Sequence, residues 1–395
     1  MAVDATVPEG LTERDAIISG IGISRIGRRT GIPGLELTLE AARAALADAG
    51  IDERDLTGIT SIGDTPVDEV AAALDVDPSY GSMGFTTGGL LNPVMDACLA
   101  VSAGRARHVL VYRTVQMLGG DVVNSGNGQG GGDAGKGDLA RVMGPMLPLL
   151  SAHAYSAANW LAMNCRRHMH EFGTTKEQLG WLAINTRRNA ALNPLAVMRD
   201  PITMDDYLTA RPVSTPFGLL DCDLPVDGAI AFVVSTAAHA GALDHPAVRV
   251  NAIGGARGQG GWVDRPDYPA QASVDAAAEM WSRTDLRPSD VGTAQLYDGF
   301  TFLTFAWLEA LGLCEVGGAG PFVEGATRIA LDGELPLNTY GGQLSAGRMH
   351  GYWILHEACV QLRSEGGARQ IAKQPEVAVV ANGGGPIAGC MLLTR

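Results

Sequence analysis

The residue types best suited to chemistry lie together in one short stretch, Asn338 to Tyr352, which holds four glycines, one histidine and two tyrosines. Closely spaced glycines let a backbone turn tightly and approach a ligand. A phenol and an imidazole on such a loop could move protons or polarise a carbonyl group. A tight connection in which the aromatic side chains only pack would have the same composition, so this stretch alone leaves both interpretations open.

Composition restricts the classes of function. The chain has 395 residues, 46% apolar and 18% charged, with a net charge of −14. A globular protein of two or three domains is expected, and nucleic acid is excluded as the main partner because phosphate binding needs a basic face. No apolar run is long enough for a transmembrane helix, and the acidic N-terminus does not resemble a signal peptide. We therefore predict a cytoplasmic protein with no membrane partner.

Cysteine and histidine spacing argues against a disulfide framework or a metal site. The six cysteines include no CxxC pair, which is typical of reduced thiols in the cytosol. His153, His168 and His170 are irregularly spaced on the expected helices, so we predict no bound metal.

The order of apolar runs predicts an α/β protein made of two similar halves. Both halves alternate strand-like and helix-like segments. In each half, a polar turn leads into a strand that precedes an aspartate, at Asp52–Asp64 and at Leu286–Asp298. The predicted strands are 16–23, 56–62, 108–112, 247–253, 290–297 and 376–381, and the predicted helices are 35–49, 88–103, 274–283 and 351–364.

Two insertions separate the halves. Residues 119–137 contain nine glycines and predict a flexible surface loop, and residues from about 138 to 210 predict a helical cap. We predict a first half of residues 1–246, which includes both insertions, and a second half of residues 247–395.

Several motifs in this order resemble the thiolase superfamily, and more narrowly the thiolase-like lipid-transfer group related to the thiolase domain of sterol carrier protein. The motifs are Ala16–Gly22, Gly173–Gly180, Arg187–Pro194, Asp221–Ala229, Tyr297–Phe300, Asn338–Gly347 and Asn382–Gly385. The resemblance covers essentially the whole chain. It implies a five-layered αβαβα arrangement of the two halves and a homodimer formed through the sheet of the first half.

The chain departs from thiolases at the nucleophile. Where thiolases carry a reactive cysteine, this sequence reads Phe85-Thr-Thr-Gly88, and the second thiolase cysteine falls near Ala381. Arg348 stands where thiolases have a histidine. Without a thiolate no acyl-enzyme forms, so we do not expect ordinary thiolase chemistry.

The pattern instead resembles retro-aldolases of steroid side-chain breakdown. These enzymes split a β-hydroxyacyl-CoA into a ketone and a shorter acyl-CoA, and they work with a small OB-fold protein. The resemblance implies a 17-hydroxy C22-CoA steroid thioester as substrate, propionyl-CoA as one product, and no metal or organic cofactor.

The reaction requires a base for the β-hydroxyl proton, donors to the thioester oxygen and an acid for the enolate carbon. Tyr297, Tyr340 and His350 are the predicted catalytic residues. A tyrosine has a pKa of about 10, so a tyrosine base needs a neighbour that lowers its pKa, and Arg348 and His350 are the candidates.

Four further residues are predicted to bind substrate or the oxyanion: Asn338, Arg348, Asp298 and, through the backbone of residues 383–385, Gly384. Each has a structural alternative, since Arg348 could be solvated and Asp298 could turn inward to order its loop. Two other functions stay open. The chain could be a non-catalytic acyl-CoA or lipid carrier, or an atypical acyltransferase that uses Cys98 or Thr86.

Overall fold

The structure is a computed structural model that describes residues 13–62, 65–83, 89–118, 147–257 and 262–395. The predicted glycine-rich loop 119–137 lies outside the described residues, as do Asp64 and the segment Phe85–Gly88. The helices are α1 (Gly34–Ala49), α2 (Val67–Ala73), α3 (Asn92–Ser102), α5 (Leu147–Ser151), α6 (Ala157–Phe172), α7 (Lys176–Ala191), α8 (Met204–Leu208), α9 (Ala272–Ser282), α10 (Thr301–Ala310), α11 (Ala319–Val323) and α12 (Tyr352–Arg363).

The strands are β1 (Ala16–Ile23), β2 (Gly58–Ser61), β3 (Tyr80–Met83), β4 (His108–Gln116), β5 (Pro212–Ser214), β6 (Phe217–Gly218), β7 (Asp227–Thr236), β8 (Val248–Arg257), β9 (Thr293–Leu296), β10 (Val377–Gly384) and β11 (Ile387–Thr394). All except β5 and β6 form one sheet, ordered β3-β2-β4-β7-β1-β8-β11-β10-β9. The two halves of this sheet meet where β1 pairs with β8 through Ile17–Arg249 and Ile18–Val248.

The two halves of the sheet have the same internal plan. In the first half β2 and β4 are parallel, and β7 runs antiparallel between β4 and β1. In the second half β9 and β10 are parallel, and β11 runs antiparallel between β10 and β8. A 3-10 turn precedes both β2 and β9, at Glu53–Asp55 and Pro288–Asp290. The predicted duplication of an α/β unit is confirmed.

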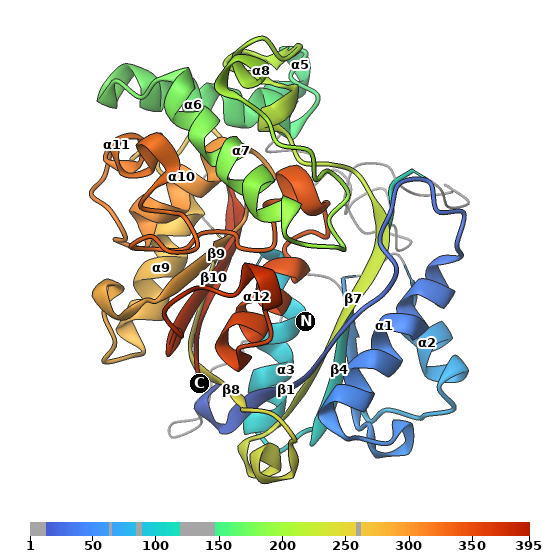
Figure 1. The fold of residues 1–395 in the computed structure, drawn as a ribbon. Helices are drawn as coiled ribbons and strands as arrows, with labels where there is room; N and C mark the ends of the chain where they lie inside the picture. Colours follow the sequence, from blue (N-terminus) through green and yellow to red (C-terminus); the bar gives the residue numbers. More distant parts are fainter. Residues whose placement is uncertain (1–12, 63–64, 84–88, 119–146, 258–261) are drawn as a thin grey trace.

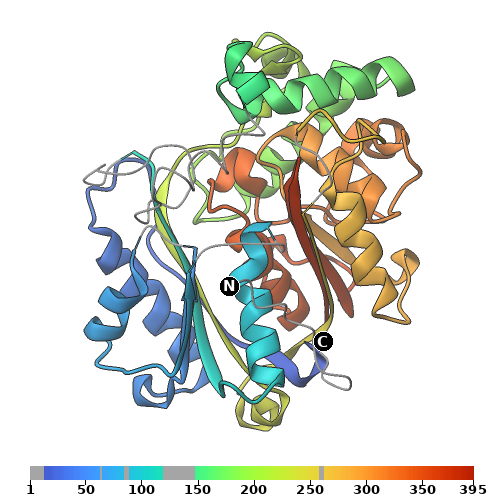
Figure 2. The same cartoon turned by 180° about the vertical axis from the view of Figure 1, so that it is seen from behind.

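The layers follow from this plan. Figures 1 and 2 show α3 and α12 side by side between the two halves of the sheet, with α1 and α2 outside one half and α9 and α10 outside the other. The central cluster of buried side chains accordingly joins α3 residues such as Val94 and Cys98 to α12 residues such as Leu355 and Leu362. This is the predicted five-layered αβαβα arrangement.

Glycine allows each outer helix to pack directly on its sheet. A Cβ atom at Gly20 in β1 would lie 2.0 Å from the carbonyl oxygen of Ala45 in α1. A Cβ atom at Gly254 in β8 would lie 2.1 Å from the carbonyl oxygen of Ala276 in α9. Helix and strand backbones therefore approach more closely in both halves than any larger residue would permit.

The predicted strands and helices are present with shifts of a few residues at their ends. The largest extensions are in β4, β8 and β10, which continue to Gln116, Arg257 and Gly384 because their antiparallel partners β7 and β11 continue the hydrogen-bonded ladders. Neither β7, β11 nor α10 was predicted as an element. The boundaries at residues 246 and 247 remain predictions.

Helices α5 to α8 occupy residues 147–208. Helices α5, α6 and α8 lie at one end of the molecule, at the top of Figure 1, and α7 runs from there toward the middle. One buried carboxylate links α7 and α8 to α10 of the second half. Asp221, which is fully buried, accepts hydrogen bonds from the Lys176 ammonium of α7, the Tyr207 hydroxyl of α8 and, at 2.7 Å, the Thr301 hydroxyl of α10. The ammonium group also lies 4.3 Å from the centre of the Tyr207 ring.

We expect Lys176→Met to lower the free energy of unfolding by about 3 kcal/mol, because it leaves the buried Asp221 carboxylate without its cation. Urea unfolding followed by circular dichroism measures the change. Lys373→Met removes an exposed lysine and should change the unfolding free energy by less than about 0.5 kcal/mol. Equal small effects of both substitutions would show that the Asp221 cluster does not hold these helices in place.

Candidate active site

The candidate site is assembled where β9 and β10 end, from segments that are far apart in the sequence. Tyr297 and Asp298 follow β9, and the glycine loop 338–351 precedes α12. Two segments of the first half complete the site. Asp223 lies in the turn before β7, where its backbone N–H donates to the carbonyl oxygen of Gly299 at 3.1 Å, and Arg113 projects from β4. In open α/β sheets, ligands bind at the carboxyl ends of the strands.

The charges of Asp223 and Arg348, which form an ion pair, act on Tyr297. Arg348 Nη1 donates to Asp223 Oδ1 at 3.2 Å, and Arg348 Nε contacts the sulfur of Met117 at 3.1 Å. Burial raises the pKa of Asp223 to about 6, although Arg348 opposes the shift. Asp223 therefore changes charge close to neutral pH, as an acid–base group should.

The Tyr297 phenol keeps its proton at neutral pH. Burial raises its pKa, Asp223 and Asp298 raise it further, and Arg348 and Gln343 offset only part of the shift. The ring folds back over Gly299, where a Cβ atom would lie 2.6 Å from Cε1 and 3.1 Å from the hydroxyl oxygen of Tyr297. Tyr297 is thus a proton donor in the resting site.

Asp298 turns inward and orders the glycine loop. Its Oδ1 accepts a hydrogen bond from the backbone N–H of Gln343 at 2.8 Å, while its Oδ2 is buried without a hydrogen-bond partner among the described residues. Burial raises the pKa of Asp298 to about 7, against the lowering effect of backbone hydrogen bonds. The structure therefore favours the inward, loop-ordering alternative.

Tyr340 is fully buried, and its ring stacks on Trp353 with centroids 5.3 Å apart. Its hydroxyl has no partner among the described residues. Burial raises the pKa of Tyr340 well above its ordinary value, and Asp298, Glu357 and Tyr297 raise it further. The expectation that Arg348 or His350 lowers the pKa of this tyrosine is wrong, because the groups that shift it are acids and phenols.

His350 has a left-handed backbone, with φ of 51°, and its carbonyl accepts a hydrogen bond from Asn382 Nδ2 at 2.8 Å. Arg113 Nη2 and Nε lie 2.7 and 3.2 Å from Nδ1 of the imidazole. Burial lowers the pKa of His350 well below its ordinary value, and Arg113 and Arg348 lower it further. His350 is a neutral imidazole at physiological pH.

The remaining predicted positions make mainly structural contacts. Asn338 pairs with the backbone of Leu296, with its side-chain oxygen accepting at 2.7 Å and its side-chain nitrogen donating at 2.9 Å. Both of its polar groups are thereby engaged. Gly384 is buried at φ of 156°, and a Cβ atom there would lie 2.4 Å from Leu303 Cδ2. The oxyanion role of residues 383–385 stays a prediction.

Cys98 is an unsuitable nucleophile. It is fully buried on α3, and burial raises its pKa above the ordinary range for a thiol. Cys390 pairs across the sheet with Ala381 and is likewise buried, with its pKa raised by burial. The other candidate nucleophile, Thr86, lies outside the described residues.

His168, a residue of α6, is buried, and its two ring nitrogens lie within hydrogen-bond distance of Thr174 and Glu309. Within the described ranges, no group of three or more His, Cys, Asp or Glu side chains could hold a metal ion. None of the described helices is long and apolar enough to cross a membrane.

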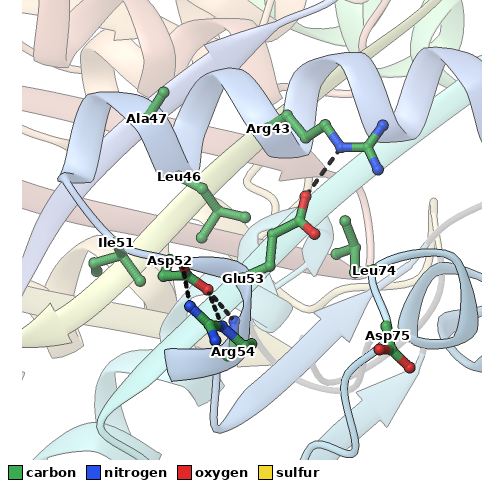
Figure 3. Close-up of a pocket in the computed structure, with 9 residues that line it drawn as sticks. All are labelled: Arg43, Leu46, Ala47, Ile51, Asp52, Glu53, Arg54, Leu74 and Asp75. Carbon is green, nitrogen blue, oxygen red and sulfur yellow. Dashed lines mark hydrogen bonds and ion pairs between the residues drawn. The ribbon is translucent and has the colours of Figure 1, made fainter.

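A surface hollow lies elsewhere, on the outer layer formed by α1, the turn Glu53–Asp55 and the end of α2 (Figure 3). Its floor is apolar, with Leu46, Ile51 and Leu74 among the lining residues. Four of the charged groups that line it form two ion pairs, Arg43 with Glu53 at 3.0 Å and Arg54 with Asp52 at 2.9 Å. None of the candidate catalytic residues lines it.

Sequence reasoning missed Asp223 and Arg113. Asp223 lies inside the motif Asp221–Ala229, so an acid at a turn before a buried strand was a visible signal. Arg113 lies in an apolar run, and a lone arginine there indicates a buried partner.

The raised pKa of Asp298 makes stability depend on pH. Between pH of about 4 and 7 the folded state holds a proton that the unfolded state has lost, so stability falls as pH rises through that window. Asparagine mimics the protonated form, so we expect Asp298→Asn to be relatively more stabilising at pH 8 than at pH 5.5, by about 2 kcal/mol.

Urea unfolding at both pH values measures this difference. Asp244→Asn, at an exposed position, controls for the loss of one negative charge. An Asp298→Asn effect that is the same at both pH values would mean that the carboxyl is ionised throughout.

Comparison with known proteins identifies the family. Residues 255–393 match the family model described as Thiolase C-terminal domain-like. Over 389 residues the chain is 33% identical to a steroid side-chain-cleaving aldolase of Thermomonospora curvata, which covers 95% of this chain and 97% of the relative. It is also 33% identical over 389 residues to the 17-hydroxy-3-oxo-4-pregnene-20-carboxyl-CoA lyase of Mycobacterium tuberculosis, covering 95% and 98% of the two chains.

Solved structures agree with this result. The Ltp2-ChsH2(DUF35) aldolase is similar with a TM-score of 0.86 and 30% identity over 98% of both chains. A monomeric SCP2-thiolase like protein type 1 from Mycobacterium smegmatis shares the fold, with a TM-score of 0.70 and 18% identity over 97% of this chain and 78% of the other. The protein belongs to the thiolase-like family that includes the steroid side-chain-cleaving aldolases, and it is a carbon–carbon lyase.

Proposed function

We propose that this chain is a retro-aldol lyase that cleaves a β-hydroxyacyl-CoA with a steroid ring system, of the 17-hydroxy C22-CoA type, into a 17-ketosteroid and propionyl-CoA. The observation that carries the proposal is the grouping of Asp223, Tyr297 and His350, which are respectively a titratable acid, a protonated phenol and a neutral imidazole. The relative from Mycobacterium tuberculosis, whose name specifies such a thioester, supports the choice of substrate.

The residues divide the reaction between them. Ionised Asp223 takes the proton of the 17-hydroxyl group, and the oxygen electrons form the ketone as the C17–C20 bond breaks. The bonding pair moves into the thioester and forms an enolate, whose oxygen is held by His350 Nε2–H. Tyr297 then donates its proton to C20, and Asp223 returns its proton to the Tyr297 phenolate. No water or cofactor is consumed.

Three other predicted residues act through these groups. Arg348 pairs with Asp223 and, with its side chain one-third exposed, extends from it toward the thioester or the CoA phosphates. Asp298 raises the pKa of Tyr297, and Tyr297 and Asp298 raise the pKa of the fully buried Tyr340, so we assign Asp298 and Tyr340 to positioning rather than to substrate contact. The cleavage proceeds without a cysteine nucleophile, in keeping with the buried, protonated thiol of Cys98.

The proposal includes a protein partner. The similar aldolase structure contains ChsH2(DUF35), and we propose that a small protein with an OB-fold helps bind the CoA ester here as well. We also propose a homodimer through the sheet of the first half and a cytoplasmic location, where the six unpaired cysteines would stay reduced.

The first test is an assay of the purified chain, co-expressed with a DUF35 protein from the same source. A 17-hydroxy steroid C22-CoA is the substrate, and the 17-ketosteroid and propionyl-CoA are measured by mass spectrometry. Release of both products in equal amounts supports the lyase. Tight binding without cleavage by any hydroxyacyl-CoA would support the carrier, and a trapped acyl-enzyme would support the acyltransferase.

We expect Tyr297→Phe and Asp223→Asn each to lower kcat by about 10²–10⁴, because each removes one proton-transfer group. In the wild type, kcat/KM should fall as pH drops below about 6, where Asp223 becomes protonated. Tyr155→Phe is the control, since Tyr155 is exposed and bonds to His153. If Tyr297→Phe retained full kcat, the proton-donor assignment would be wrong.

Gly299→Ala tests the placement of the Tyr297 ring. The added methyl group would overlap Cε1 and displace the phenol ring, so we expect kcat to fall at least about tenfold while the fold is kept. In Gly241→Ala the methyl group meets no atom within 4 Å, which makes it the matched control. A Gly299→Ala enzyme with wild-type kcat would show that the ring position does not matter.

A further inference from the structure

Arg113 is a buried arginine on a strand that otherwise faces the central layer with apolar side chains. Val109, Val111 and Val115, which share its face of β4, belong to the central cluster of buried residues. Leu110 and Tyr112 belong to the cluster under α1. Strand alternation therefore points Arg113 toward α12 and the loop that precedes it, and only 5% of its surface is exposed. A buried arginine needs hydrogen-bond partners that offset the free-energy cost of removing its guanidinium group from water.

One of these partners is the imidazole of His350, 237 residues away in the sequence. Nη2 and Nε of Arg113 lie 2.7 and 3.2 Å from the same ring nitrogen, Nδ1, and Nη1 donates to the carbonyl oxygen of Ile62 at 2.7 Å. A guanidinium group can only donate hydrogen bonds. Nδ1 of His350 must therefore be an acceptor, so it carries no proton.

We propose that Arg113 is the positioning residue that holds His350 as the neutral tautomer with its proton on Nε2, aimed at the thioester oxygen. The catalytic meaning of this inference depends on the proposed function, whereas the tautomer itself does not. An imidazole with Nε2–H can donate one hydrogen bond to an oxyanion, and a cation at its other nitrogen makes that N–H more acidic and a stronger donor.

The surroundings of the ring favour the neutral form over imidazolium. The charged groups that act on the imidazole are Arg113 from β4 and Arg348 from its own loop, and Asn382 of β10 contacts only its backbone carbonyl. A protonated Nδ1 would point a hydrogen at the guanidinium group and place two positive charges in contact. Burial acts in the same direction, because it disfavours the charged ring.

Lysine could not replace Arg113 fully. The guanidinium plane donates to His350 and to Ile62 at the same time, whereas an ammonium group on a flexible stem offers a single point of charge. The orientation of the His350 ring and its tautomer should therefore depend on the guanidinium group itself. A lysine at position 113, which supplies only the charge, should support only part of the wild-type kcat.

The direct test is an NMR spectrum of the full chain in complex with its DUF35 partner, with ¹⁵N in the histidine rings. His350→Gln identifies the His350 signals by their loss. We expect an unprotonated Nδ1 and a protonated Nε2 in the wild type, unchanged between pH 5.5 and 8. A protonated Nδ1, or titration of the ring in that range, would overturn the inference without any variant being needed.

Substitutions at Arg113 test whether this residue acts on kcat through His350. We expect Arg113→Lys to lower kcat about tenfold with less than a threefold change in KM, and Arg113→Met to lower kcat about a hundredfold and to give a mixture of tautomers. Arg107→Met removes an exposed arginine next to β4 and serves as the control. In a His350→Gln background the amide supplies the N–H, so Arg113→Lys should cause no further loss of kcat.

The outcomes separate the two proposals. A wild type with the expected tautomer but no lyase activity would contradict the proposed function and leave the positioning role intact. An active lyase in which Arg113→Lys keeps both kcat and the tautomer would remove the positioning role alone. An equal loss of kcat on Arg113→Lys in the wild-type and His350→Gln backgrounds would show that Arg113 acts on the fold and not through His350.

Discussion

Burial of ionisable groups is the constraint on which the chemistry of this molecule depends. Burial of the ionisable groups of Tyr297, Asp298 and His350 makes the charged form of each costly. The phenol keeps its proton, the imidazole stays neutral, and the carboxyl groups of Asp223 and Asp298 titrate near neutrality. A thiolase needs one ionised sulfur, whereas a retro-aldol reaction needs weak acids and bases that exchange protons in both directions. Side chains that stay neutral or titrate near neutral pH suit the second task.

The backbone around the site is as specialised as the side chains. Residues 342–346 form a buried π-helical turn, bounded by Gly341 at φ of 109° and Gly347 at φ of 143°. Hydrogen bonds secure this turn from several sides, from Met198 to the Ser345 carbonyl, from Arg187 Nε to the Ser345 hydroxyl at 2.9 Å and from Gln343 N–H to Asp298. These contacts therefore hold the loop in place, so that His350 keeps its left-handed backbone conformation.

Much of the fold could be predicted from the sequence, because the local spacing of apolar residues indicates most of its strands and helices. Apolar runs such as Ala16–Ile23 and the helical spacing of residues 35–49 depend on neighbours a few positions away. The resemblance carried by motifs such as Asn338–Gly347 extended this reading to the family. The site itself was predictable only in part. The phenol at the end of β9 and the histidine on the glycine loop could be named from position and residue type.

The directions of the pKa shifts of Tyr297 and His350 could not be predicted from the sequence, because they depend on which groups from other parts of the fold surround each side chain. Arg348 was expected beside Tyr340, yet it pairs with Asp223. Asn338 was expected to bind substrate, yet its side-chain amide forms hydrogen bonds with the backbone N–H and carbonyl oxygen of Leu296 at the end of β9.

The origin of the site in both halves has a mechanical consequence. The first half supplies Asp223 and Arg113, and the second supplies Tyr297 and His350, each beside a partner from the other half. The sheets of the two halves are joined by the short β1–β8 pairing. The halves also meet where α3 packs against α12 and through polar contacts such as the Arg348–Asp223 ion pair. A small rotation between them would change the placement of Asp223 relative to Tyr297 and move the Arg113 guanidinium away from the His350 imidazole at the same time. The packing of α3 against α12, together with the polar contacts between the halves, therefore helps to set the distances between these four side chains.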